Sequence, residues 1–227
     1  MDIGALILSL KLALLVSCAL LVLGLPLAYW LAFTHRRWKF LFESLVALPL
    51  VLPPTVLGFY LLVALGPQSP LGRLWRDWTG HALAFTFEGL VIGSILYSFP
   101  FAVQPIAASF AGIDRKLFAA SSSLGASAPR TFFRITVPLA MPGIITGFVL
   151  AFAHTLGEFG VVLMIGGNIP GITKTISIAI YDDVQSLNYS SANKSALLLL
   201  AVSFVTLCLV YGLNRRSSQL GPVGNQR

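Results

Sequence analysis

The sequence predicts an all-α protein, a polytopic bundle of membrane-spanning helices. Hydrophobic residues make up 56% of the 227 residues and charged residues only 10%, whereas soluble domains carry about 25% charged residues. The mean hydropathy of +0.85 is correspondingly high, and the apolar residues are gathered in long uninterrupted stretches. A chain of this composition has too little polar surface to cover a water-soluble core, so the lipid bilayer is its expected environment.

Five apolar stretches reach the roughly 20 residues that a helix needs to cross the hydrocarbon core. They cover residues 6–33, 40–65, 84–110, 136–157 and 195–213. A sixth stretch, 159–167, has nine residues and ends in Gly-Gly. We expect it to re-enter the membrane or to extend the fourth helix. Six spans remain the alternative if residues 159–180 cross completely.

Proline interrupts three of these stretches, and each proline removes a backbone donor and kinks or ends a helix. Broken helices can line a transport pathway and supply hinges, but ordinary kinks in a packed bundle would leave the same pattern. The prolines are Pro49, Pro53 and Pro54 in the second stretch, Pro100 and Pro105 in the third, and Pro138 and Pro142 in the fourth.

The distribution of Lys and Arg predicts the orientation, because cytoplasmic connections carry an excess of both. Counted along a five-span chain, one side holds ten of the 15 Lys and Arg and the other holds five, including Lys11. The richer side holds 35–39, 111–135 and the C-terminal residues. We therefore expect the multi-pass protein in the plasma (inner) membrane of a prokaryote, with the N-terminus outside and the C-terminus in the cytoplasm. Since the cations are not gathered on one soluble element, nucleic-acid binding is not expected.

The connection between the third and fourth stretches predicts a short helix on the cytoplasmic surface. Asp114 is a suitable N-cap, and Gly125 stands where a residue with positive φ would end the helix. One face would present Leu117, Ala120, Ser121 and Leu124 at helical spacing. Pro129 blocks continuation of the helix, and residues 135–138 lead back into the membrane.

This connection resembles the EAA motif of binding-protein-dependent ABC importer permeases. That pattern has Glu-Ala-Ala, three residues, Gly, nine residues, and then Ile-x-Leu-Pro. Its spacing from Gly to Ile and from Gly to Pro is matched here, although Ala replaces the Glu, Ser the second Ala, and Val the Leu before the Pro. The matching positions are Ala119, Ala120, Ser121, Gly125, Ile135, Val137 and Pro138.

The resemblance extends beyond the connection, since residues 85–105 and 156–175 are similar to the molybdate and sulfate branch of this family. The continuation over 168–182 looks closer to the molybdate members, with sulfate, and tungstate of nearly the same size, as the alternatives. The resemblance implies a type I permease subunit that is not an enzyme and needs no cofactor. The sequence fits this role, because it contains no G-x-x-x-x-G-K-[ST] motif for ATP hydrolysis.

The resemblance also implies partners and a domain layout. Five spans are too few to enclose a pathway, so we expect a homodimer with two cytoplasmic ABC ATPase subunits and an extracytoplasmic oxyanion-binding protein. The transmembrane permease domain would cover 5–213, with the coupling loop at 111–138, and 214–227 would form a polar cytoplasmic tail. The ATPase-coupling residues would be Arg115, Lys116, Ala119, Ala120, Ser121, Gly125, Ile135 and Pro138.

Glu158 is the most conspicuous ionisable residue, because it lies in an apolar context with His154 one helical turn before it. An ionisable group in a membrane segment is a functional candidate by default. A gate or pathway role is one reading, and a structural bond to His154 or to a backbone N–H is the other. No third ligand follows at helical spacing, so no metal site is expected. Uncharged groups that could contact an oxyanion in the pathway are Thr55, Ser98, Gln104, Thr155 and Asn168.

Two other classes of membrane protein compete with this interpretation. A secondary transporter or channel would need no ATPase, but the positive connection at 111–135 and the lack of a duplicated inverted half disfavour it. An intramembrane enzyme would need a Ser–His pair or a metal motif at matching depth, and only His154 is a candidate for such a pair.

Overall fold

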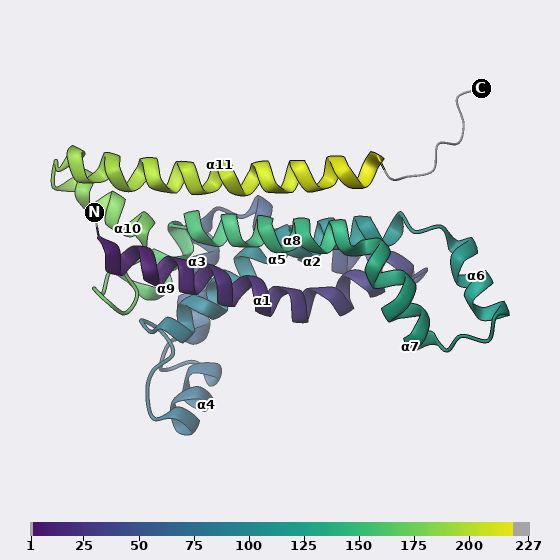
Figure 1. Ribbon diagram of the computed structural model, residues 1–227. Coiled ribbons are helices and arrows are strands. Elements are labelled where there is room, and N and C mark those ends of the chain that lie inside the picture. Colours follow the sequence, from purple (N-terminus) through teal and green to yellow (C-terminus); the bar gives the residue numbers. More distant parts are fainter. Residues whose placement is uncertain (1, 220–227) are drawn as a thin grey trace.

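The computed structural model describes residues 2–219, and within them every regular element is helical (Figure 1). Four long helices form the body: α1 (Ile3–Phe33), α5 (Phe87–Ala111), α8 (Val137–Gly157) and α11 (Tyr189–Gln219). The shorter elements are α2 (Lys39–Val51), α3 (Pro54–Leu65), α4 (Pro70–Thr79), α6 (Arg115–Ser123), α7 (Ala128–Thr131), the π-helical segment η1 (Phe132–Thr136), α9 (Gly160–Gly166) and α10 (Ile176–Gln185).

The membrane spans agree with the predicted fold class. Four helical stretches are long and apolar enough to cross a bilayer, and the pair α2 and α3 makes a fifth if it is counted as one bent span. The bend between α2 and α3 is 110°. It falls at Leu52 and Pro53, where two consecutive prolines lack the N–H groups that would continue the helix. The second predicted span is therefore two helices rather than one.

Other boundaries differ from the predicted ones. The fourth span starts at Ala128, since α7 and η1 run without a break into α8 and Pro129 lies in the first turn, where it is tolerated. Helix α11 begins at Tyr189 and continues to Gln219, past the expected end at 213. The remainder of the predicted tail, 220–227, lies outside the described residues. The stretch 159–167 forms the separate short helix α9 and does not extend α8.

The core of the bundle lies where α1, α5 and α8 meet, and small residues allow their backbones to approach closely. A Cβ atom added at Gly147 would lie 2.7 Å from the carbonyl oxygen of Ala102, and one at Gly143 would collide with Ser109. Phe110, Ile106 and Val103 are fully buried at the end of the bundle next to α6. These contacts fix the ends of α5 and α8 from which the α6 connection projects.

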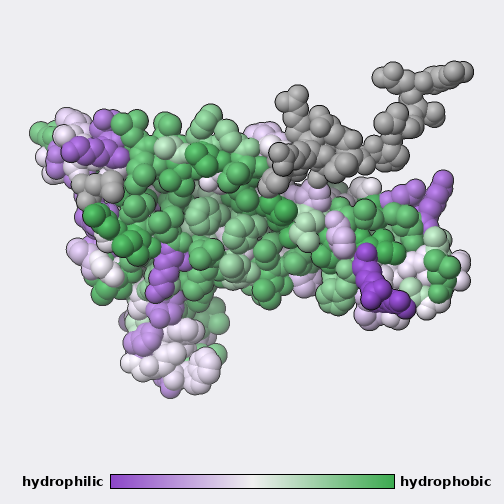
Figure 2. All heavy atoms as spheres, viewed as in Figure 1, coloured by the Kyte–Doolittle hydropathy of each residue, from purple (hydrophilic) through white to green (hydrophobic). Residues whose placement is uncertain are grey.

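The surface divides into an apolar middle and polar ends. Figure 2 shows hydrophobic side chains over the central part of the bundle and hydrophilic ones near its two ends and on the projection formed by α4. Helix α1 begins at the end of the bundle opposite α6, and α11 ends on the side of α6 (Figure 1). This distribution is the one expected of a bundle that crosses a bilayer along its long axis.

Candidate functional site

Helix α6 is an independently capped surface helix. The carboxylate of Asp114 accepts a hydrogen bond from the Lys116 N–H at 2.9 Å. At the other end Gly125 has φ +73°, its N–H donates to the Ser122 carbonyl at 3.0 Å, and the Ala126 N–H donates to the Ser121 carbonyl at 3.1 Å. These two bonds form a Schellman motif, which requires a residue with positive φ. The predicted N-cap and the predicted role of Gly125 in the turn are both confirmed.

Three side-chain contacts join α6 to the rest of the protein. The hydroxyl groups of Ser121 and Thr131 are 2.7 Å apart. The Phe118 ring packs edge-on against Phe33 at the end of α1, with centroids 5.3 Å apart, and Arg115 Nη1 lies 3.2 Å from His35 Nε2. A displacement of α6 would therefore disturb its contacts with both the end of α1 and α7.

The predicted coupling residues divide into those that face outward and those that hold the helix. The side chains of Ser121 and Ile135 are buried and half-buried, respectively, and both line an open cavity of about 420 Å³ between α6 and η1. The small side chains on the outer surface leave the backbone of α6 open to close approach by another protein. The exposed members are Arg115, Lys116, Ala119, Ala120, Gly125 and Pro138.

A second candidate site lies where two broken helices meet. An open cavity of about 590 Å³ is lined by Thr55 at the start of α3, Tyr97 on α5, His154 on α8, and Glu158 between α8 and α9. Helices α3 and α9 approach closely here, since a Cβ atom added at Gly160 would lie 2.6 Å from Pro54 Cβ. The structure thus brings three of the predicted pathway residues, Thr55, His154 and Glu158, to one cavity.

Ser98 and Thr155 lie next to this cavity and hold His154, one of its lining residues, in place. Ser98 Oγ lies 2.9 Å from His154 Nδ1 and 2.8 Å from Thr155 Oγ1, which joins α5 to α8 by a buried polar network. The His154 ring stacks on Phe101, with centroids 3.9 Å apart. Its orientation is therefore fixed on two sides, and the ring lines the cavity in a defined position.

Glu158 has one of the two structural partners expected for it. Its side chain is 5% exposed, and Oε1 accepts a hydrogen bond from the Val161 N–H at 3.1 Å. This bond satisfies a backbone donor in the first turn of α9. His154 bonds to Ser98 instead, so the alternative pairing of His154 with Glu158 is not seen among the bonds of the described residues. Nor does any group of three metal-ligating side chains occur within 2–219.

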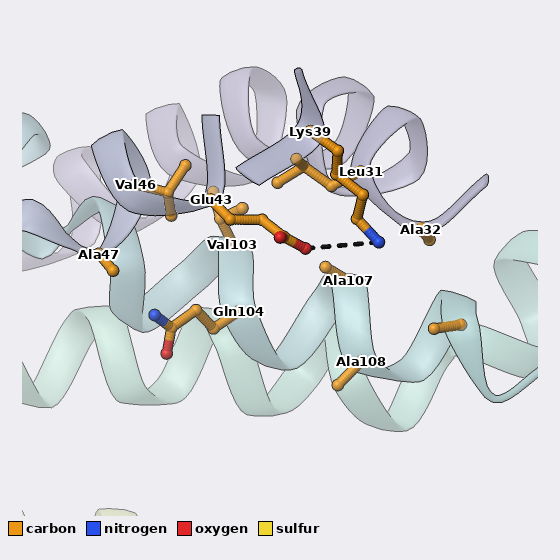
Figure 3. A pocket seen from close by; sticks show the side chains of 11 residues that line it. Leu31, Ala32, Lys39, Glu43, Val46, Ala47, Val103, Gln104, Ala107 and Ala108 are labelled. Carbon is orange, nitrogen blue, oxygen red and sulfur yellow. Dashed lines mark ion pairs between the residues drawn. The ribbon is translucent and has the colours of Figure 1, made fainter. Parts of the chain in front are cut away.

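The two remaining pathway candidates lie elsewhere. Gln104 lines a separate cavity of about 410 Å³ between α1, α2 and α5, beside the ion pair of Lys39 and Glu43 with its 3.4 Å separation (Figure 3). Asn168 donates hydrogen bonds to both carboxylate oxygens of Asp182, at 2.9 and 2.8 Å. Neither residue lines the cavity at the helix breaks.

Asp182, in the second half of α10, is the centre of a polar cluster. Lys174 Nζ lies 2.7 Å from its carboxylate. Burial alone would raise the pKa of Asp182, but the hydrogen bonds from Lys174 and Asn168 and the Lys174 charge outweigh it, so the pKa lies below the ordinary 3.8. The cluster therefore connects the loop after α9 to α10. Asn168 contributes to this connection through its two hydrogen bonds to Asp182.

Sequence reasoning missed four residues that complete these sites. Thr131 and Phe118 anchor α6, His35 contacts Arg115, and Tyr97 lines the cavity at the helix breaks. Of these four, Phe118 could have been identified from the local sequence, since it is the aromatic residue of a helix with mostly small side chains. Thr131 and His35 contact residues that are 10 and 80 positions away in the chain, and Tyr97 lines a cavity with residues of other helices. No spacing pattern in the sequence identifies such contacts.

The chain matches the family model described as "Binding-protein-dependent transport system inner membrane component" over residues 24–219. It is 49% identical to the molybdenum transport system permease protein ModB of Azotobacter vinelandii, covering 94% of this chain and 95% of that one. The corresponding protein of Escherichia coli K12 is 40% identical, with 95% and 94% covered.

Solved structures show the same fold at low sequence identity. The MetNI methionine ABC transporter aligns with a TM-score of 0.74 at 14% identity, covering 96% of each chain. A bacterial ABC transporter that imports alginate aligns with a TM-score of 0.73 at 19% identity, covering 97% of this chain and 80% of that one. These two likenesses show that this chain shares the fold of both proteins.

Proposed function

This chain belongs to the family of binding-protein-dependent transport system inner membrane components, and we propose that it is the permease subunit of an ATP-driven importer of molybdate. It is a multi-pass inner-membrane protein and a transporter subunit rather than an enzyme. Its family depends on a binding protein, and this dependence implies an ABC ATPase as a further partner. The likeness to molybdenum permeases over nearly the whole chain carries the choice of substrate.

The α6 connection supports docking of the ATPase. The permease domain, residues 5–213, would contact it through the coupling loop 111–138, and α6 would fill a groove on the ATPase surface. Exposed Ala119 and Ala120 permit close backbone approach, while Arg115 and Lys116 offer positive charge to acidic groups. The bonds of α6 to Thr131 and the contact with Phe33 would pass its movement to α8 and α1.

The polar cavity at the helix breaks supports a role in the pathway. Hydroxyl and imidazole groups at Thr55, Tyr97 and His154 offer uncharged hydrogen bonds to an oxyanion. A fixed cationic site would hold a dianion too tightly to release it, whereas uncharged donors let it pass. Because the cavity is open to one side of a single chain, we propose that a second copy completes it, giving a homodimer with two ATPase subunits.

The orientation belongs to the same proposal. The α6 end of the bundle carries Arg36, Arg37, Arg115 and Lys116 and would face the cytoplasm. The C-terminus would lie on that side, with the N-terminus and the loop around α4 outside. An extracytoplasmic oxyanion-binding protein would then deliver its ligand to the end formed by α9 and α10. Labelling of single cysteines at 69 and 122, in a variant without Cys18 and Cys208, tests this from both sides.

Competition between oxyanions tests the substrate. Vesicles that contain the permease, its ATPase and the binding protein should take up labelled molybdate. Excess tungstate should suppress this uptake, since the two ions are nearly equal in size, and the same excess of sulfate should suppress it far less. Uptake of labelled sulfate that a large molybdate excess leaves unchanged would refute the molybdate assignment. The permease assignment would survive that result.

A further inference from the structure

Helix α2 is loosely packed on the bundle. Of its 13 residues, Val46 is the one that is buried, although the helix is mostly apolar and lies in a predicted span. Phe42, Leu45 and Leu48 are 42%, 65% and 45% exposed. Apart from the contact of Phe42 with Trp30 of α1, these side chains are largely uncovered in the described part of the chain.

An apolar groove runs along this side of α2. It has a volume of about 520 Å³ and lies between α2 and the middle parts of α1 and α5. Every side chain that lines it is apolar, including Leu27 from α1, Leu45 from α2 and Leu96 from α5. Since the groove has no hydrogen-bonding side chain, it suits an apolar occupant such as a hydrocarbon chain.

The segment that leads into the N-terminal end of α2 is cationic. The segment 35–39 reads His-Arg-Arg-Trp-Lys, and Arg36 and Arg37 are exposed. Lys39 is already paired with Glu43 (Figure 3), whereas no ion pair engages Arg36 or Arg37 within residues 2–219. Trp38 is 71% exposed beside them, as is usual for tryptophan at the level of lipid headgroups.

We propose that an anionic phospholipid binds here, with one acyl chain in the groove along α2 and its phosphate at Arg36 and Arg37. A hydrocarbon groove with cations at its polar end matches the two parts of such a lipid, because Lys and Arg near the membrane surface attract anionic headgroups. The Arg115–His35 contact of 3.2 Å places this headgroup site next to α6. The inference does not depend on which ion the protein transports.

Trp30 offers a local reporter for the groove. Its ring lies edge-on to Phe42, with centroids 4.9 Å apart, and Phe42 lines the groove. In the full-length protein with Trp38→Phe, Trp75→Phe and Trp78→Phe, fluorescence comes from Trp30 alone. The experiment compares phosphatidylglycerol and phosphatidylcholine, each brominated on its acyl chains, at the same low mole fraction in unlabelled phosphatidylcholine vesicles.

We expect brominated phosphatidylglycerol to quench Trp30 several-fold more than brominated phosphatidylcholine. Arg36→Gln with Arg37→Gln should reduce this quenching to the phosphatidylcholine level. Leu45→Phe with Leu96→Phe, at two exposed positions, should reduce it by narrowing the groove. The matched control, Leu197→Phe with Leu200→Phe, makes the same change at two exposed positions of α11 and should leave the quenching unchanged.

Two results would overturn the proposal. Equal quenching by the two lipids would mean that Trp30 senses only the surrounding bilayer. Cross-linking of Leu48→Cys between two copies of the chain, together with absent quenching, would mean that a second copy covers α2. Since neither measurement involves uptake, failure of the lipid site leaves the transport proposal intact, and failure of molybdate uptake leaves the lipid site intact.

Discussion

Ser121 and Thr131 share a hydrogen bond of 2.7 Å between their hydroxyl groups, and this bond connects α6 to the helix that continues into the membrane as α8. Ser121 is buried although the outer residues of α6 are exposed. The bond spans the Gly125 turn, so it closes the loop between the two helices. We therefore expect Ser121 to contribute to coupling by holding α6 in place.

Ser121→Ala should weaken coupling because it leaves the Thr131 hydroxyl without its partner, at a cost of about 1 kcal/mol. We expect less ATPase to co-purify with the variant at equal membrane abundance. Ser122→Ala and Ser123→Ala are the controls, since these hydroxyls bond to carbonyls of α6 itself. A loss as large in either control would show that the Ser121–Thr131 bond has no special role.

Gly143→Ala should destabilise the bundle, because the added methyl group would collide with Ser109 on α5. Overpacking of this kind costs about 1–3 kcal/mol, which thermal unfolding in detergent would show as a lower Tm. Gly212→Ala is the control, since no atom lies within 4 Å of its added Cβ. An unchanged Tm for Gly143→Ala would contradict the close packing of α5 on α8.

Ser98→Ala should lower uptake without affecting ATPase binding. The change removes the hydroxyl that contacts both His154 and Thr155, so the imidazole ring in the cavity loses a positioning bond worth about 1–3 kcal/mol. Ser17→Ala is the matched control, because that buried hydroxyl bonds to the Ala13 carbonyl of its own helix. Normal uptake by Ser98→Ala would remove His154 from the proposed pathway.

Asp182 gives a prediction about pH. Its folded pKa is below the ordinary 3.8, so its interactions contribute stability above that value and lose the contribution as the pH falls through the folded pKa. The Tm of the wild type should therefore exceed that of Asp182→Asn above about pH 5, and the difference should vanish at strongly acidic pH. Asp183→Asn, which breaks no ion pair within 2–219, should show no such difference. A Tm difference independent of pH would contradict the role of the Asp182 charge.

Sequence patterns predicted the fold class and the α6 connection because both rest on local signals. Apolar length predicted the spans, and Asp114 and Gly125 marked the ends of α6 by their capping chemistry. The bend of 110° at Pro53 was signalled by two adjacent prolines, but its size depends on packing of α3 against α9, through contacts such as Pro54 with Gly160. Likewise, the hydrogen-bond partner of His154 depends on how α5 packs against α8, because Ser98 lies 56 positions away from His154 in the sequence.

We propose that the α6 connection couples this permease to an ATPase, and Gly125→Asp tests that proposal with a single substitution. Gly125 has φ +73° with open space around it, so the chain itself tolerates the change at about 1–2 kcal/mol of backbone strain. The added side chain would therefore clash with a docked ATPase and not with the chain itself. The exposed Ala119→Glu, which restores the residue of the EAA pattern, should be tolerated.

The decisive measurement is ATP-driven molybdate uptake by vesicles that contain equal amounts of wild type or Gly125→Asp together with the ATPase and the binding protein. We predict that Gly125→Asp inserts normally, binds little ATPase and loses nearly all uptake, while Ala119→Glu retains it. Full uptake by Gly125→Asp would mean that the α6 connection only links two helices, and it would contradict the claim.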